Sequence, residues 1–225
     1  LEAVHPEFDL HRSGPTVYEE VRNHLTVELD NCDFQKDKIA LIAQWSPDET
    51  PTNSLNDYIE ALDDQGFGIV VISTSNASNN LQLSAAATAV TTVIRRPNIG
   101  YDFGSWSVAF HLYPNLFNKN QVLITNDSCY GPFGNLAEVF DAAESAPFDI
   151  VSLTDNAYMR YHLQSYFLLF KKAAISTKFA KKFWLNIRRQ KDKSNVITAY
   201  EIGLSNQAQI AGLHVGALFP WNSCV

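Results

Sequence analysis

The chain has 225 residues, of which 46% are hydrophobic and 18% charged, and this is enough for one substantial hydrophobic core. The formal net charge of −7 argues against nucleic acid as the main partner, because a phosphate backbone requires a basic protein surface. No apolar run approaches the ~20 residues that a membrane-spanning helix needs, and the first residues lack a signal-peptide pattern.

The chain is expected to form one domain with a short polar extension. Residues 1–15 are polar and form this lead-in, and no linker or repeat interrupts residues 16–225. Because the chain begins with Leu1, we expect the domain to be excised from a longer protein. The cysteines Cys32, Cys129 and Cys224 lack metal-ligand spacing, and their odd number favours a reducing compartment, the cytoplasm, over a disulfide framework.

Apolar periodicity predicts helices and strands that alternate along the chain. The first half is predicted to hold a helix at 16–29, a strand at 38–45, a helix at 54–66 capped by Ser54, and strands at 67–74 and 91–96. The second half is predicted to hold a helix at 106–113, a strand at 121–127, a helix at 135–145, strands at 148–155 and 163–170, helices at 176–190 and 195–212, and a short strand at 214–219. This order predicts an α/β domain with a mostly parallel central sheet flanked by helices.

Polar side chains gather where the predicted strands end, and ligands of parallel sheets bind beyond the carboxyl ends of the strands. The residues predicted to bind substrate at this edge are Gln44, Ser73, Arg95, Asn98, Gly100, Tyr101, Asp102, Asn126, Ser128, His162 and Gln164.

The segment RRPNIGYDFGSW, residues 95–106, is one of two concentrated signals. Its glycines permit close approach or unusual backbone angles, and Arg95 or Arg96 can neutralise a phosphate. We interpret it as the loop after a strand and the first turn of the next helix, beside a polar ligand. The alternative is an ordinary turn with polar side chains.

The second signal is LITNDSCYGPFG, residues 123–134, in which Asp127 directly follows a buried strand. A carboxylate there can hold a hard cation that bridges two phosphates. The alternative is that Asp127 starts a turn or caps the next helix. Two loops that each combine glycine with an acid favour a nucleotide site, although the Walker A, dinucleotide and Gly-x-Ser-x-Gly motifs are all missing from the sequence.

Two further segments carry candidate functional groups. Alternation along 162–170 predicts that His162, Gln164 and Tyr166 share one face, where they would bind sugar hydroxyls or His162 would ligate a metal. The alternative for His162 is a structural hydrogen bond. Lysine and arginine are concentrated in 178–193, which indicates a solvated helix face or, alternatively, a docking patch for anionic lipid or a lipid-diphosphate acceptor.

Four segments in this order resemble the rhamnan synthesis protein F family: RRPNIGYDFGSW, LITNDSCYGPFG, HLQSYFLLF and AYEIGLSNQ. The resemblance extends over about residues 38–212. It implies a GT-A-like glycosyltransferase fold that binds a nucleotide-diphosphate sugar and acts in bacterial cell-surface polysaccharide assembly. The sequence TND would take the place of the GT-A Asp-x-Asp motif, with Asp127 as the catalytic metal ligand for Mg²⁺ or Mn²⁺. Because Thr125 stands at the first position, dependence on a cation stays open.

The resemblance also suggests a catalytic base, Glu201, on the helix predicted at 195–212. Glu201 shares the inward side with Ile197 and Leu204, and an inward carboxylate is costly unless it is paired or used in chemistry. In many inverting GT-A enzymes a helix-borne acid deprotonates the acceptor hydroxyl. The alternative is a buried glutamate that an arginine, a tyrosine or a helix terminus satisfies.

The preferred hypothesis is an inverting rhamnosyltransferase that moves L-rhamnose from dTDP-L-rhamnose to a glycan or lipid-linked glycan. We expect it in the cytoplasm, with peripheral association at the inner face of the plasma membrane. The alternative is a catalytically inactive module of a larger synthase that binds a nucleotide sugar or a glycan. A nucleotide-sugar pyrophosphatase is disfavoured, because the sequence has no acidic cluster for two metals.

Overall fold

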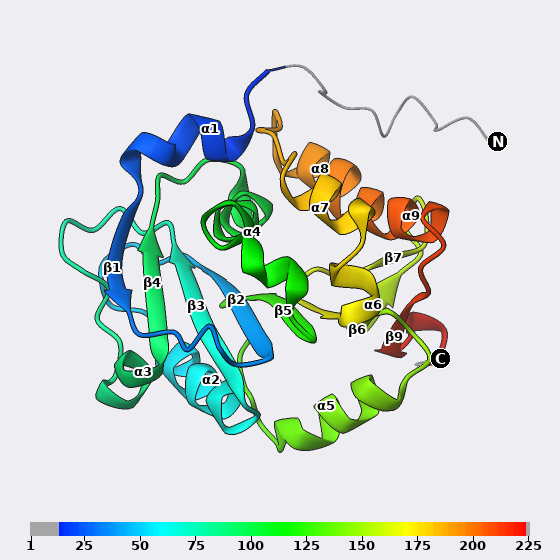
Figure 1. Cartoon of the computed structure of the whole chain (residues 1–225), viewed down its shortest axis with the longest axis horizontal. Coiled ribbons are helices and arrows are strands. Elements are labelled where there is room, and N and C mark those ends of the chain that lie inside the picture. Colours follow the sequence, from blue (N-terminus) through cyan, green and yellow to red (C-terminus); the bar gives the residue numbers. More distant parts are fainter. Residues whose placement is uncertain (1–13, 224–225) are drawn as a thin grey trace.

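The computed structural model describes residues 14–223, so Cys224 and residues 1–13 of the predicted lead-in lie outside the described residues. The described residues form a central sheet of nine strands (Figure 1). Its strands are β1 (Thr26–Asp30), β2 (Lys38–Gln44), β3 (Phe67–Ser73), β4 (Thr91–Arg95), β5 (Gln121–Asn126), β6 (Ile150–Asn156), β7 (His162–Leu163), β8 (Phe167–Lys171) and β9 (Val215–Phe219). Their order is β1-β4-β3-β2-β5-β8-β6-β7, and β9 pairs with β6.

The sheet is mixed rather than mostly parallel as predicted. Strands β4, β3, β2 and β5 are parallel neighbours, and β9 is parallel to β6. Strand β1 is antiparallel to β4, β7 is antiparallel to β6, and β8 is antiparallel to both β5 and β6. Because β8 reverses direction between them, β5 and β6 still point the same way. The carboxyl ends of β2–β6 and β9 therefore share one edge of the sheet.

Helices cover both faces of the sheet (Figure 1). One face packs against α4 (Tyr101–Leu112), α7 (Lys178–Trp184) and the helical run of α8 (Lys193–Val196), a π-helix (Ile197–Ile202) and α9 (Gly203–Ile210). The other face packs against α2 (Asn53–Asp64), α3 (Ala85–Val90) and α5 (Leu136–Ser145). Short helices α1 (Val17–Val21) and α6 (Lys172–Ile175) complete the first layer.

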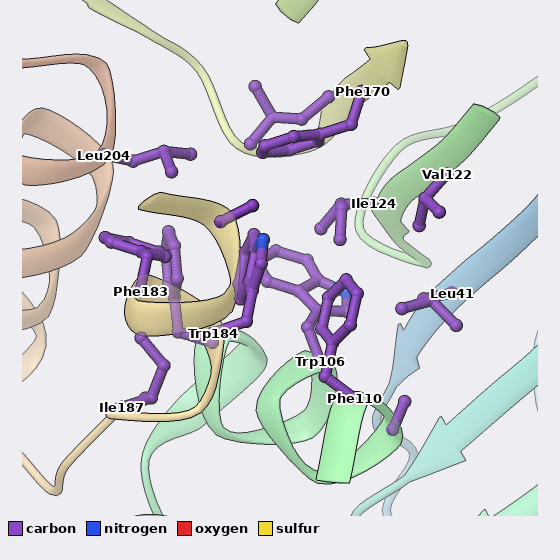
Figure 2. Packing of buried hydrophobic residues seen from close by; sticks show 14 of the residues in the cluster. Leu41, Trp106, Phe110, Val122, Ile124, Phe170, Phe183, Trp184, Ile187 and Leu204 are labelled. Atoms are coloured by element: carbon purple, nitrogen blue, oxygen red, sulfur yellow. The ribbon is translucent and has the colours of Figure 1, made fainter. Parts of the chain in front are cut away.

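Helix α4 is fixed by the large core on its face of the sheet. All its residues from 103 to 110 are buried, and Figure 2 shows Trp106 and Phe110 beside Trp184 of α7 and Ile124 of β5. The Trp106 Nε1–H donates a hydrogen bond to the Thr125 carbonyl at 2.9 Å. This bond connects α4 to the carboxyl end of β5 and places the first turn of α4 at the carboxyl edge of the sheet.

Several predicted boundaries are wrong for identifiable reasons. The helix predicted at 16–29 ends in a 3₁₀ turn at Arg22–His24, and the following residues form β1 because they pair with β4. Thr52, not Ser54, is the N-cap of α2, and the Ser54 hydroxyl instead donates to the Gly131 carbonyl at 2.9 Å. Helix α3 was not predicted. The strand predicted over 162–170 is two separate strands, β7 and β8.

Two further findings concern membrane-spanning helices and the state of the cysteine thiols. No helix among the described residues is long and apolar enough to cross a bilayer. Cys32 and Cys129 are free thiols, and burial raises the pKa of Cys32 to about 12.

Candidate functional site

A cleft of about 380 Å³ opens at the carboxyl edge of the sheet, between the end of β5, the first turn of α4 and the π-helix. Its lining residues are Tyr101, Asp102, Phe103, Asn126, Ser128, Gln164, Ser165, Tyr166, Lys193, Val196, Ile197 and Glu201. Six of the residues predicted to bind substrate or to act in catalysis at strand ends and on the last helix meet here: Tyr101, Asp102, Asn126, Ser128, Gln164 and Glu201.

Asp102 and Asn126 join the two sequence segments that carried the strongest signals. The Asn126 side-chain amide donates to Asp102 Oδ2 at 3.0 Å. Burial raises the pKa of Asp102, and the charge of Glu201 adds to this effect. The hydrogen bond from Asn126 and the charges of Lys193 and Arg96 act in the opposite direction. The first turn of α4 therefore does reach the end of β5, as the sequence predicted.

Asp127 follows Asn126 directly and lies beside the cleft, although its side chain is not part of the lining. Its Oδ2 accepts a hydrogen bond from the backbone N–H of Trp45 at 3.2 Å, which holds it against the end of β2. Burial raises the pKa of Asp127 to about 6, and the charge of Asp102 contributes in the same direction. The charge of Asp102 thus lies close enough to disfavour ionisation of Asp127.

Glu201 enters the cleft from the opposite side, on the π-helix Ile197–Ile202. Its Oε1 accepts a hydrogen bond from the backbone N–H of Ser165 at 2.7 Å. A π-turn contains one more residue than an α-turn, and such turns are frequent at functional sites. Ile197, which was predicted as part of the buried stripe, is 37% exposed in the cleft wall.

Gln164 lies in the cleft and His162 does not. The Thr154 hydroxyl donates to Gln164 Oε1 at 2.6 Å, which orients that amide. His162 is buried in β7, and its Nδ1 lies 2.8 Å from the Arg160 carbonyl oxygen. Of the three side chains predicted to share one face, Gln164 and Tyr166 line the cleft, whereas His162 does not.

Arg95 has a structural position outside the cleft. Its guanidinium donates to the carbonyls of Ser75, Ala77 and Asn79 at 3.0–3.1 Å and forms an ion pair with Glu28 at 2.9 Å. It therefore holds the loop that follows β3, and it is not placed to neutralise a phosphate in the cleft.

The Arg96 guanidinium is likewise held by hydrogen bonds within the protein. It is 2% exposed, and its Nη1 donates to Ser105 Oγ at 2.7 Å and to the Tyr101 carbonyl at 3.3 Å. Its Nη2 donates to the Ile99 carbonyl. Burial lowers the pKa of Arg96 to about 10. These bonds shape the loop that precedes α4, so the second arginine of the segment is structural as well.

The glycines of this segment also serve the fold. Gly100, predicted to bind substrate, has φ +82°, and a Cβ there would lie 2.6 Å from Val17 Cγ2. A Cβ on Gly104 would lie 2.6 Å from the Ile99 carbonyl oxygen. Close packing of α4 against α1 and its own loop therefore explains both glycines. Asn98 is exposed on the same loop and does not line the cleft.

The two predicted residues at the ends of β2 and β3 are buried and outside the cleft. Ser73 Oγ accepts a hydrogen bond from the Ser75 N–H at 3.3 Å, so it shapes its own turn. Gln44 is 2% exposed, and within residues 14–223 neither atom of its amide has a hydrogen-bond partner.

Sequence reasoning missed two polar residues of the cleft. Ser165 contributes the backbone N–H that holds Glu201, and no sequence signal identifies such a contact. Lys193 lines the cleft from α8. It belongs to the basic segment 178–193, which the sequence analysis treated as one patch, so its separate position could be found only from the fold.

Asp127 and Asp102 are the two carboxylates at this edge that could hold a cation together with a phosphate. Within the described residues, no group of three or more His, Cys, Asp or Glu side chains could hold a metal ion. However, Mg²⁺ is usually held by one or two carboxylates together with substrate phosphates, and Asp127 beside Asp102 offers such carboxylates.

Comparison with known proteins identifies the family. A family model described as rhamnan synthesis protein F matches residues 69–221, which include every residue that lines the cleft. The chain belongs to the rhamnan synthesis protein F family. This confirms the resemblance found in the four sequence segments, and it connects the chain with polysaccharide synthesis.

Two curated relatives of this family member are similar over most of its length. An uncharacterised protein, y4gN, of Sinorhizobium fredii (strain NBRC 101917 / NGR234) is 28% identical over 72% of the chain. The virulence protein VirA of Vibrio anguillarum is 27% identical over 82% of the chain. The aligned regions cover 43% and 60% of these two relatives. The chain therefore spans about half the length of the curated relatives that it matches.

Proposed function

We propose that this rhamnan synthesis protein F family member is a GT-A-like inverting glycosyltransferase, and that it transfers L-rhamnose from a nucleotide-diphosphate donor to a bacterial cell-surface glycan. The observation that carries the proposal is the position of Glu201. This carboxylate faces the Asp102–Asn126 pair across one cleft at the carboxyl edge of the sheet, and the Ser165 N–H holds it there.

In the proposed reaction Glu201 is the general base. Its carboxylate takes the proton from an acceptor hydroxyl, and the resulting oxygen nucleophile attacks the anomeric carbon of the sugar. The bond from that carbon to the phosphate oxygen breaks on the opposite face, and the nucleoside diphosphate leaves with the electron pair. Ser165 supports this role because its N–H, 2.7 Å from Glu201 Oε1, fixes the direction of the carboxylate.

Asp102 and Asn126 are proposed to orient the donor sugar. Their hydrogen bond joins α4 to β5, so both side chains are held on rigid elements, and positioning of reactants is worth a large part of a transfer barrier. Gln164, Ser128 and Tyr101 complete the polar wall of the cleft and are proposed to bind sugar hydroxyls.

Asp127, assisted by Asp102, is the group proposed to hold a divalent cation. When bound, Mg²⁺ or Mn²⁺ would supply positive charge for the phosphate oxygens of the leaving group. Without it, the Asp127 carboxylate still orients the end of β2 through its bond from the Trp45 N–H.

Donor binding and transfer by the purified chain test this proposal. Nucleoside diphosphates are first screened by thermal shift, since a ligand that binds only the folded state raises the melting temperature. The chain is then incubated with dTDP-L-rhamnose and a rhamnose-containing polysaccharide, and the release of dTDP and the mass of the glycan are followed. Release of dTDP with growth of the glycan is expected. Binding without transfer would instead favour an inactive donor-binding module. The absence of both binding and transfer would refute the proposal.

A further inference from the structure

We propose that Lys193 is the residue of the cleft that binds the phosphates of a nucleoside diphosphate. This inference rests on the proposed function and deepens it, because it assigns the donor's phosphates to a group that the sequence analysis did not single out. The sequence predicted that Arg95 or Arg96 would have this role, and the structure gives both side chains other partners.

The first support is the distribution of positive charge. Both guanidiniums of the 95–106 segment are held by protein acceptors: Arg95 by three carbonyls and Glu28, and Arg96 by carbonyls and the Ser105 hydroxyl. Among the described residues that line the cleft, Lys193 alone carries a positive charge. Lys193 is therefore the one cationic side chain among these lining residues that can contact a dianionic leaving group.

The second support is the position of Lys193 in the fold. Lys193 lies at the start of α8, exposed to solvent, so its long side chain can change direction at little cost. Its charge reaches Asp102, whose carboxylate it favours electrostatically. Asp102 is hydrogen-bonded to Asn126 at the end of β5, and Lys193, Asp102 and Asn126 all line the same cleft.

The third support is the chemical requirement of the site. Asp102, Asp127 and Glu201 bring three carboxylates to one edge, and a diphosphate would be repelled by them unless a cation intervened. A lysine whose charge balances Asp102 can contact phosphate oxygens when the donor binds. The charge-assisted hydrogen bonds formed in this way are the stronger kind in proteins.

Isothermal titration of Lys193 variants tests this assignment, with dTDP, inorganic pyrophosphate and thymidine as the probes. Lys193→Gln removes the charge and Lys193→Arg retains it. Lys191→Gln is the matched control, because Lys191 is an exposed lysine two residues earlier that does not line the cleft. Thermal unfolding of each variant checks that the fold is intact.

We expect Lys193→Gln to weaken the binding of dTDP and pyrophosphate about tenfold or more. Lys193→Arg and Lys191→Gln should bind both within about threefold of the unmodified chain, and thymidine binding should not respond to any of the changes. Added salt should weaken dTDP binding more in the unmodified chain than in Lys193→Gln.

These measurements distinguish failure of the Lys193 assignment from failure of the transferase proposal. Equal dTDP affinity in Lys193→Gln and the unmodified chain would overturn the role of Lys193 while leaving the transferase intact. Loss of dTDP binding in Lys193→Gln, in a chain that transfers no sugar, would support Lys193 and count against the transferase. If the unmodified chain binds neither dTDP nor pyrophosphate, both are overturned.

Discussion

Replacement of Asp127 by asparagine is expected to stabilise the protein at neutral and alkaline pH while it reduces sugar transfer. Burial raises the pKa of Asp127 from its ordinary value of 3.8 to about 6. The folded state therefore binds a proton more tightly than the unfolded state does. The stability that this proton provides is complete below about pH 4 and is lost as the pH rises through about 6.

The magnitude follows from the same pKa values. The difference between 3.8 and about 6 corresponds to about 3 kcal/mol, since each pKa unit is worth ~1.4 kcal/mol. Solvent screening of this half-buried carboxylate reduces the expected effect to about 1–2 kcal/mol. Asparagine does not ionise, and its side-chain oxygen can still accept the hydrogen bond from the Trp45 N–H. The free energy of unfolding of Asp127→Asn, relative to that of the unmodified chain, should therefore increase by about 1–2 kcal/mol from pH 4 to pH 8.

Urea unfolding at pH 4 and pH 8, followed by tryptophan fluorescence, measures this gain. Asp57→Asn is the control, because it removes the same charge from an exposed position on α2 and should show no such pH-dependent gain. A stability difference between Asp127→Asn and the unmodified chain that is equal at both pH values would refute the reasoning, as would a less stable Asp127→Asn protein at pH 8. Unchanged sugar transfer in this variant would remove Asp127 from the proposed site.

Two further substitutions test the structural roles assigned to the 95–106 segment. Arg95→Met leaves the Glu28 carboxylate, whose side chain is 6% exposed, without its ion-pair partner. Thermal unfolding should show that stability falls by about 3–5 kcal/mol and that adding Glu28→Gln partly restores it. The affinity for dTDP should be retained. Gly104→Ala places a methyl group 2.6 Å from the Ile99 carbonyl oxygen and should cost about 1–3 kcal/mol in urea unfolding, and unaltered stability there would contradict the packing described for α4.

The order of elements was largely predictable because the buried strands are long apolar runs. Strands β2, β3 and β5 are almost entirely buried, and each ends in polar residues that the sequence displays clearly. The direction of β8 was not predictable, since β8 has the same buried apolar pattern as the parallel strands β2, β3 and β5. Its antiparallel pairing depends on where the chain returns after β7, which is a property of the tertiary structure.

The site was predictable in outline but not in its charge distribution. Asp102, Asn126 and Glu201 converge as expected, because strand ends and an inward carboxylate can be recognised locally. The partner of an arginine cannot be recognised in this way: Arg95 contacts carbonyls up to 20 positions away and pairs with Glu28 on β1. The π-helix around Glu201 was also hidden, since its composition is that of an ordinary amphipathic helix.

The transfer rate of Glu201→Gln tests the central claim most directly. Glutamine keeps the size of the side chain and can still accept the hydrogen bond from the Ser165 N–H, so donor affinity and melting temperature should stay close to those of the unmodified chain. Because the amide cannot take the acceptor proton, sugar transfer should fall by ~10²- to 10⁴-fold. A stable, donor-binding Glu201→Gln protein with near-normal transfer would contradict the account.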